Sequence, residues 1–465
     1  VSLAMILSGV LFANALFASE KPDLAVLKKD QPNILFIVFD DLSILLPALD
    51  YDGIETPNLD RLFNRGMFFN RAYANAPLCG PSRTSFMFGL HPTSTGEYGN
   101  HSDYRKNPSR PLSWGGYLKN NGYTNFIRGK IYQNRYIPYE EWDEAVMYDK
   151  DDDAEKVDAY ENGFARCAKL KCGDEGMDDY QMTTWAVEHL KQSYDKPFLL
   201  GVGLHTTHGS KYAPEKYFKD IPLDTIKLPE LHWDDLDDLP ERAKAYAKSE
   251  REFMPTYRDG KFPEMVQGYL ATLLFTDAQV GRILDALEEG GHADNTIVMA
   301  WSDHSIHHGQ KLKFAKNSLW RWSVQVPFSI SVPGMTQPNS RSNRAVQLLD
   351  IYPTISELAG LPVPEHCEGT SLVPLLRDPE APWSHPVVTV SSKPIGLTYA
   401  VRTEKWAYLK YVDEGEELYD LEKDPDELTN LLYKNSPEYQ PVVERLKKHI
   451  PANPVLPPSR AKNLR

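Results

Sequence analysis

The sequence predicts an α/β fold, with a large mixed, mostly parallel sheet flanked by helices and a smaller C-terminal α+β domain. Continuous apolar runs of strand length are typical of strands that are buried on both faces, as in parallel sheets. Helical patterns lie between these runs, which predicts layers of helices on a sheet. From about Pro364 the strand-like pieces become short and are separated by turns, which indicates a second domain.

The N-terminal segment predicts export. Leu3 to Ala18 is an apolar run with small residues near its end, and a charged, proline-containing stretch follows at once. This run is too short for a transmembrane helix and suits a signal peptide, residues 1–18. We therefore expect a periplasmic or secreted protein; a buried helix or an uncleaved anchor is the alternative interpretation.

Five apolar runs predict the strands of the main sheet, and four of them end in polar residues. The runs, each with the residues that follow it, are Ile34–Phe39 with Asp40 and Asp41, Tyr123–Ile127 with Arg128, Gly129 and Lys130, Phe198–Leu204 with His205, Thr296–Trp301 with Ser302, Asp303 and His304, and Phe328–Val332 with Pro333 and Gly334. Open α/β sheets bind ligands at the carboxyl ends of their strands. Together these ends predict one polar site over the edge of the sheet.

Two helices of the large domain have clear signals at their ends. Thr56 suits the cap of a helix that opens at Pro57, and Gly66 is expected to end it. Met265–Glu289 is a long amphipathic pattern that ends at Gly290. Both helices are expected to pack their apolar faces on the sheet.

The C-terminal part predicts three short strands and one helix. The strands are expected at Thr398–Val401, Trp406–Tyr411 and Glu417–Leu421. A final helical pattern runs to His449, and Ser436 is suited to cap it. An acidic run, Asp149–Asp153, lies in the large domain and is expected to be a solvated loop.

The formal net charge of −14 argues against several partners. Such a surface repels nucleic-acid phosphates, so nucleic acid is not expected to bind. An anionic substrate would need a local basic or metal-bearing pocket. No other apolar run reaches membrane-spanning length, so no stable membrane association is expected.

The four cysteines are too few for a disulfide scaffold. In an exported protein Cys167 and Cys172 could pair across a short loop, which leaves Cys79 and Cys367. Cys79 comes just before a predicted helix N-terminus, where free N–H groups favour an anion, and Arg83 lies one turn further on. A capped helix with a buried cysteine fits these local signals equally well.

Aspartates follow two of the predicted strands. Asp40 and Asp41 come from one strand end, and Asp303 comes from another, followed by His304. A hard divalent cation prefers several charged oxygens, and the carboxylates would repel one another without one. The two strand ends together therefore predict a cation site, whereas either strand end alone would indicate an ordinary turn.

The segment Cys79-Gly80-Pro81-Ser82-Arg83 carries the Cys-x-Pro-Ser-Arg signature of sulfatases. From about Pro32 to Leu432 the chain resembles this family and looks most like bacterial sulfatases similar to iduronate-2-sulfatase. The resemblance implies that a formylglycine-generating or sulfatase-maturating enzyme oxidises Cys79 to formylglycine. It also implies one Ca²⁺ ion per chain, and the residues implied as its ligands are Asp40, Asp41, Cys79, Asp303 and His304.

The resemblance further implies which residues act in catalysis: Cys79, Arg83, Lys130, His205 and Lys316. One hydroxyl of hydrated formylglycine would attack sulfur, the cations would stabilise the sulfuryl group, and His205 would help to protonate the leaving alcohol. The second hydroxyl would then lose its proton and expel sulfate. Residues 19–370 would be the catalytic sulfatase domain, residues 371–465 the smaller domain, and the substrate a sulfated polysaccharide or oligosaccharide.

Several positions depart from the family pattern. Gln133 stands where a histidine is common, and the segment from His205 to His208 lacks the usual proline. His307 and His308 are additional, and the roles of all these positions stay open. Two alternative functions also stay open: a phosphomonoester or phosphonate hydrolase of the same alkaline-phosphatase-like superfamily, and a non-catalytic binder of sulfated glycans.

Overall fold

The computed structural model describes residues 31–133, 136–147, 160–162, 165–392, 396–412, 415–434 and 436–456. The predicted signal peptide and the acidic run Asp149–Asp153 lie outside these residues. Within them, no helix is both long and apolar enough to cross a lipid bilayer.

The main sheet has eight strands in the order β15-β2-β14-β10-β1-β8-β4-β5. Their bounds, in that order, are Ser340–Ser342, Met67–Phe69, Phe328–Ser331, Thr296–Ser302, Asn33–Phe39, Phe198–Leu204, Thr124–Gly129 and Glu144–Val146. Among the described strands of this sheet, β14 alone runs antiparallel to its neighbours. The prediction of a mixed, mostly parallel sheet is therefore confirmed.

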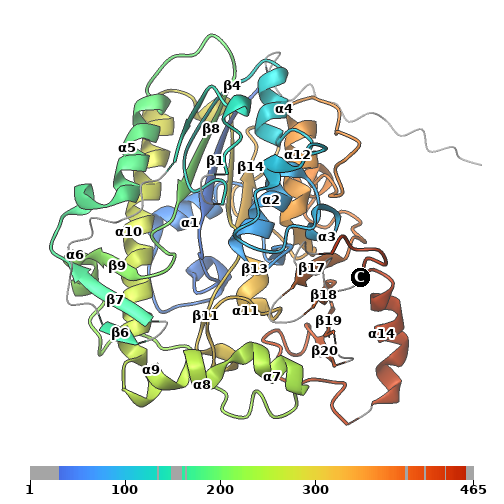
Figure 1. Cartoon of the computed structure of the whole chain (residues 1–465). Coiled ribbons are helices and arrows are strands. Elements are labelled where there is room, and N and C mark those ends of the chain that lie inside the picture. Colours follow the sequence, from blue (N-terminus) through green and yellow to red (C-terminus); the bar gives the residue numbers. More distant parts are fainter. Residues whose placement is uncertain are drawn as a thin grey trace, which may run out of the picture.

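The sheet is the middle of three layers (Figure 1). Helices α1, α5 and α10 cover one face, and their bounds are Pro57–Phe63, Asp178–Leu190 and Phe262–Glu289. Helices α2, α4 and α12 cover the other face, and their bounds are Cys79–Phe88, Trp114–Asn120 and Ile351–Leu358. Both faces are buried, which explains why the strands read as continuous apolar runs.

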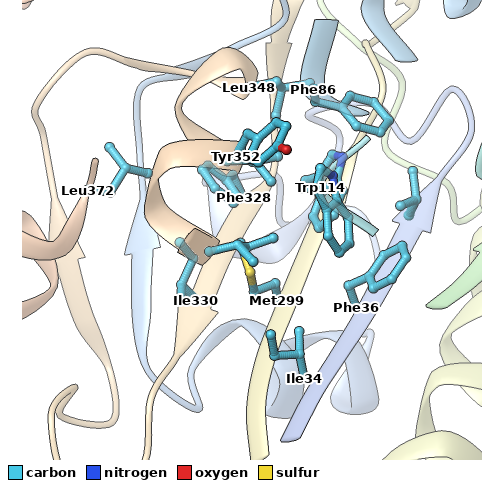
Figure 2. Packing of buried hydrophobic residues seen from close by; sticks show 14 of the residues in the cluster. Ile34, Phe36, Phe86, Trp114, Met299, Phe328, Ile330, Leu348, Tyr352 and Leu372 are labelled. Atoms are coloured by element: carbon cyan, nitrogen blue, oxygen red, sulfur yellow. The ribbon is translucent and has the colours of Figure 1, made fainter. Parts of the chain in front are cut away.

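Strand β1 supplies side chains alternately to the two cores. Ile34 and Phe36 point into the core beneath α4 and α12, whereas Leu35 and Ile37 point to the core beneath α10. Figure 2 shows the first core, where the Phe36 ring lies 4.7 Å from the ring of Trp114 in an edge-to-face arrangement. The site therefore rests on a rigid, fully buried strand.

The predicted helices form, but their predicted caps do not. Thr56 occupies the N-cap position of α1 without a side-chain hydrogen bond. Instead, the Asp277 carboxylate of α10 accepts hydrogen bonds from the backbone N–H groups of Asn58 and Leu59, at 2.9 and 2.7 Å. Ser436 likewise makes no capping bond, because a 3-10 turn, Pro437–Tyr439, precedes helix α14, Gln440–Lys447.

The C-terminal sheet is antiparallel, in the order β17-β18-β19-β20, with bounds Val387–Ser391, Thr398–Arg402, Trp406–Lys410 and Glu416–Asp420. Helix α14 packs on one face of it through Val443 and Leu446. The other face packs on Trp320 and on α7, Glu241–Ala247. This arrangement confirms the predicted smaller C-terminal α+β unit.

Short elements complete the described part of the chain. The small sheets consist of β11 and β12 (His307–His308, Phe314–Ala315), of β13, β3 and β16 (Gln325–Val326, Ala72–Tyr73, Val346–Gln347), and of β6, β7 and β9 (Tyr160–Asn162, Ala165–Leu170, Lys211–Pro214). The short helices are α3 (Pro92–Thr95), α6 (Glu215–Lys219), α8 (Ser249–Glu252), α9 (Met254–Arg258), α11 (Arg321–Val324) and α13 (Val373–Arg377).

The structure does not form a disulfide bond between Cys167 and Cys172, the pair that the sequence allows.

Candidate active site

The strand register brings the predicted polar residues to one edge of the sheet. Phe39 of β1 pairs with Ser302 of β10 and with Leu204 of β8, so these three strands end at the same level. Gly129 of β4 pairs with Gly203 of β8. The polar residues that follow, including Asp40, Asp303 and Lys130, therefore share that edge, as predicted.

The two strand ends are joined by hydrogen bonds. The backbone N–H of Asp303 donates to the Phe39 carbonyl at 3.0 Å, and the N–H of Asp41 donates to the Asp303 carboxylate at 3.3 Å. Asp41 adopts a left-handed backbone conformation with φ of 61°, a geometry that aspartate tolerates better than most residues. This sharp turn directs Asp41 toward the same side of the sheet edge as Asp303.

Cys79 is the first residue of α2 and is 1% exposed. Its Sγ atom lies 3.6 Å from an Asp40 carboxylate oxygen and 3.2 Å from Nε2 of His304. Potential ligand atoms of Asp40, Cys79, Asp303 and His304 all lie within 4.8 Å of one another. The structure thus brings together the cysteine and the aspartates, as the sequence predicted.

Three cationic side chains surround Asp40, Asp41 and Asp303. We call these three aspartates the carboxylate cage. Arg83 donates from Nε to Asp303 at 2.9 Å, and its guanidinium lies 3.3 Å from Asp40. Lys316 donates to Asp41 at 2.7 Å and lies 3.2 Å from the Cys79 sulfur.

The third cation is Lys130, which donates to the second carboxylate oxygen of Asp40 and lies 4.0 Å from the sulfur of Cys79. Arg83 also donates to the backbone carbonyl of Lys130, which fixes the two side chains relative to each other. Both lysines therefore reach the same buried atom of Cys79 from different elements. An anionic group held at position 79 would meet two ammonium groups and a guanidinium.

Charge shapes the protonation of the cage. Burial would raise the pKa of Asp40, but adjoining cations such as Lys130 and Arg83 outweigh it and hold this pKa well below its usual range. Burial likewise opposes ionisation of Asp41, and Lys316 overcomes it, so the pKa of Asp41 is lowered. Burial raises the pKa of the Cys79 thiol to about 12. Asp40 and Asp41 are thus ionised and the unmodified thiol is protonated at neutral pH.

The structure separates the two histidines of the segment from His205 to His208. His208 lies 3.9 Å from Asp40 and 3.8 Å from Asp41, and it shares a second group of potential ligand atoms with Asp40, Asp41 and Cys79. Burial lowers the pKa of His208 to about 3, so its imidazole is neutral at pH 7. The sequence alone assigns no role to His208, and the structure places it at the cage.

His205 is oriented by Asp179, the second residue of α5. Its Nδ1 atom lies 2.8 Å from the Asp179 carboxylate, and its backbone N–H donates to the same group at 3.0 Å. Asp179 also accepts from the backbone N–H of Thr206 at 2.9 Å. Asp179 was not predicted, because its part in the site depends on how α5 packs under the end of β8.

His307 and His308 are buried behind the cage in β11. His307 contacts the Gln310 carbonyl at 2.9 Å and the Ser318 hydroxyl at 2.7 Å, which accounts for both ring nitrogens. The ring of His308 lies 4.0 Å from that of Tyr269. Within the described residues, neither histidine belongs to a group of potential metal ligands.

Gln133 lies on the helix side of the site. Together with Gly80, Arg83 and Tyr136 it lines a small cavity of about 20 Å³ next to the start of α2. Its amide can hydrogen-bond but cannot transfer protons at neutral pH. It borders Arg83 and the backbone that follows Cys79.

A buried side chain at a helix start, framed by carboxylates and fixed cations, is suited to the hydrolysis of anionic esters. A family model described as Sulfatase matches residues 32–361, and one described as N-sulphoglucosamine sulphohydrolase, C-terminal, matches residues 309–454. A Sulfatase of Formosa agariphila is 33% identical over 448 residues, which covers 91% of this chain and 87% of that relative. The human Iduronate 2-sulfatase is 27% identical over 405 residues, covering 75% and 73% of the two chains. The chain belongs to the sulfatase family and is a sulfuric ester hydrolase.

Solved structures share the whole architecture. A protein in complex with its substrate D-glucosamine-2-N,6-O-disulfate superposes with a TM-score of 0.72 at 22% identity, covering 90% of this chain and 96% of the other. A phosphonate monoester hydrolase from Silicibacter pomeroyi superposes with a TM-score of 0.76 at 20% identity, covering 93% and 96%. At these identities the likeness establishes the fold.

Proposed function

We propose that this chain removes sulfate from a sulfated saccharide by means of formylglycine made from Cys79 and one bound Ca²⁺ ion. The observation that carries the proposal is the position of the Cys79 side chain, between the cage and the ammonium groups of Lys130 and Lys316. A sulfuryl group bound there would lie among donors that stabilise the charge of its oxygens.

The donor set fits a calcium ion. Three carboxylate side chains converge from two strand ends, and hard cations prefer charged oxygen ligands. We propose Asp40, Asp41, Asp303, His304 and the oxidised side chain of residue 79 as the residues that would hold it. When bound, the ion would draw charge away from the oxygens of the sulfuryl group.

Oxidation of Cys79 would supply an oxygen nucleophile in place of a thiol that is protonated at neutral pH. Arg83 would orient the site, because its guanidinium joins Asp40 and Asp303 across the two strands. Lys130 and Lys316 would bind sulfuryl oxygens as fixed positive charges. Their burial makes this contribution larger than it would be in water.

Two histidines can serve the proton transfers. His208 is neutral and lies beside Asp40 and Asp41, so it can accept a proton or hydrogen-bond a substrate oxygen. Asp179 orients the imidazole of His205 through Nδ1, so Nε2 is the ring nitrogen that would act on the substrate. We assign protonation of the leaving alcohol to His205, with Asp179 as the residue that positions it.

The saccharide class is supported by the relatives. The chain resembles the human Iduronate 2-sulfatase in sequence and, in fold, a protein in complex with its substrate D-glucosamine-2-N,6-O-disulfate. Trp114, Tyr132 and Trp142 are buried, so these three rings do not offer a face for sugar stacking.

We further propose that the protein is exported through its N-terminal segment and that a formylglycine-generating or sulfatase-maturating enzyme modifies it.

The test is sulfate release from a panel of defined sulfated mono- and disaccharides, measured by ion chromatography. Matched phosphate and phosphonate monoesters serve as competing substrates. Mass spectrometry of the peptide that contains position 79 reports the oxidation, and a Ca²⁺ titration of chelator-treated enzyme reports the metal. Phosphonate or phosphate hydrolysis that exceeds sulfate release on every scaffold would overturn the proposal, as would full activity of the Cys79→Ala variant.

A further inference from the structure

A groove lies beside the C-terminal sheet, with a volume of about 420 Å³. We call it the C-terminal groove, and the residues that matter in it are Trp383, His385, Lys405, Trp406, Arg445 and His449. They come from three segments: the stretch before β17, the turn between β18 and β19, and the end of α14. No cage residue lines it, and its volume falls in the range typical of small-ligand pockets.

Two indole rings give the groove rigid aromatic walls. Trp383 is partly buried, and its Nε1 donates to the Ala345 carbonyl at 2.8 Å, while the His385 ring stands edge-on to it at 4.8 Å. Trp406 is partly buried against Leu446 and its neighbours. Aromatic rings held in this way offer apolar faces at little cost in conformational entropy, and the apolar faces of sugar rings stack on them.

Basic groups line the rest of the groove. Within the described part of the chain, no carboxylate lies within 4.0 Å of Arg445, and both Arg445 and His449 are exposed. The one lining carboxylate, Glu404, is engaged by Arg344 at 2.9 Å. Lys405 lies over the Trp406 ring at 5.6 Å and pairs with Glu422 outside the groove at 2.7 Å. The groove therefore offers the Arg445 guanidinium without a carboxylate partner, on a protein whose net charge is −14.

We infer that the C-terminal groove binds a sulfated polysaccharide chain at a second site, separate from the cage. Stacking surfaces beside the Arg445 guanidinium match the apolar ring faces and anionic substituents of such a polymer. The inference rests on the proposed function for the polymer it names. Neutral glycans lack the anions, and polyphosphate lacks the ring faces.

The position of the groove suits a polymer that reaches the active site. Strand β17 begins beside the groove, and near its far end the N–H of Val390 donates to the Asn75 carbonyl at 2.9 Å, four residues before Cys79. Five residues of strand span roughly 15 Å, so the groove and Asn75 are separated by a distance that a polymer of several sugars covers. A chain held at the groove raises the local concentration of its other residues at the cage.

The experiment measures polymer binding in a Cys79→Ala background, so that the polymer is not consumed. Immobilised dextran sulfate is the probe, unsulfated dextran tests the need for sulfate, and polyphosphate tests a simple charge effect. Arg445→Glu is compared with Lys448→Glu, which makes the same charge change one turn further along but lies outside the groove. Trp406→Leu removes the aromatic face and keeps an apolar side chain on the core.

Arg445→Glu and Trp406→Leu are each expected to weaken dextran sulfate binding by at least about tenfold, with Lys448→Glu close to the parent. With residue 79 restored, both groove variants are expected to keep the parental rate on a small sulfated saccharide and to show a raised KM for the polymer. Equal losses in Arg445→Glu and Lys448→Glu, or polyphosphate binding as tight as that of dextran sulfate, overturn the inference. A parent that binds the polymer but releases no sulfate refutes the proposed function and leaves the groove in place.

Discussion

Replacing Lys316 with methionine tests the cage through its charge balance. The Lys316 ammonium lies 2.7 Å from Asp41, and the two side chains are 13% and 6% exposed. Removing one partner of a buried pair typically costs about 3–5 kcal/mol, because the other charge stays buried. Lys316 is not fully buried, so we expect the lower end, about 3 kcal/mol in the free energy of unfolding of metal-free protein.

Calcium is expected to change this cost. With the ion bound, Asp41 keeps a positive partner, and the repulsion between the ion and the ammonium disappears in the variant. If about 2 kcal/mol of the loss is recovered in this way, linkage requires Lys316→Met to bind Ca²⁺ roughly 30-fold more tightly than the parent. The same variant is expected to lose turnover, since it lacks a cation at the sulfuryl group.

The measurement is urea unfolding near neutral pH, with chelator or with saturating Ca²⁺, together with a calorimetric Ca²⁺ titration. Lys313→Met is the matched control, because Lys313 lies 2.7 Å from Glu252, both are buried, and the pair is separate from the cage. It should cost about 3–5 kcal/mol in both conditions. If Lys316→Met costs the same with and without Ca²⁺ and binds the ion no more tightly, the assignment of the cage as a calcium site is wrong.

Three further outcomes are expected. Cys79→Ser should abolish sulfate release and leave the thermal unfolding midpoint close to that of the parent, because the substitution changes only one buried atom; an active serine variant would contradict the formylglycine chemistry. Asp179→Asn should lower kcat by roughly tenfold or more on alkyl sulfates and less on aryl sulfates, whose leaving groups need no proton from His205; equal losses on both would rule out its positioning role. Burial lowers the pKa of Lys211 from 10.5 to about 8, so the stability that this group contributes is present above pH 10.5 and is lost as pH falls to 8. Lys211→Met should therefore be more stable than the parent at pH 7, by up to about 3 kcal/mol less about 1 kcal/mol for the lost bond to the Thr207 carbonyl. In urea unfolding above pH 10.5 only the lost bond remains, so the variant should there be about 1 kcal/mol less stable than the parent.

The cage could be predicted because its residues follow strands with an unambiguous signal. Ile34–Phe39 and Thr296–Trp301 are long apolar runs, and a parallel pair in register must present the next residues together. Local physics alone does not assign a catalytic role to Cys79, since a buried cysteine at a helix start has ordinary explanations. Its contact with Asp40 depends on where α2 crosses the sheet edge, which no local pattern states.

Other parts of the site depend on packing between segments that are distant in sequence. Asp179 supports His205 only because α5 lies beneath the end of β8, and its sequence signal is that of any acidic residue in the first turn of a helix. Asp277 replaces the predicted cap at Thr56 because α10 lies against the start of α1. In both cases a carboxylate from another element satisfies backbone N–H groups that sequence reasoning assigns to the nearest polar side chain.

The charges and donors of the site bear on the choice between sulfatase and phosphatase chemistry. Three carboxylates of the cage face Arg83, Lys130 and Lys316, so these fixed charges nearly cancel. One divalent cation then leaves an excess of about two positive charges, which suits an anionic ester and its transition state. A second divalent cation, as in two-metal phosphatases, would double that excess and would need further ligands. Within the described residues, neither His307 nor His308 belongs to a group of potential metal ligands, so these two histidines do not supply them. The donor set therefore favours a single cation beside the side chain of residue 79, the arrangement on which sulfatase chemistry depends.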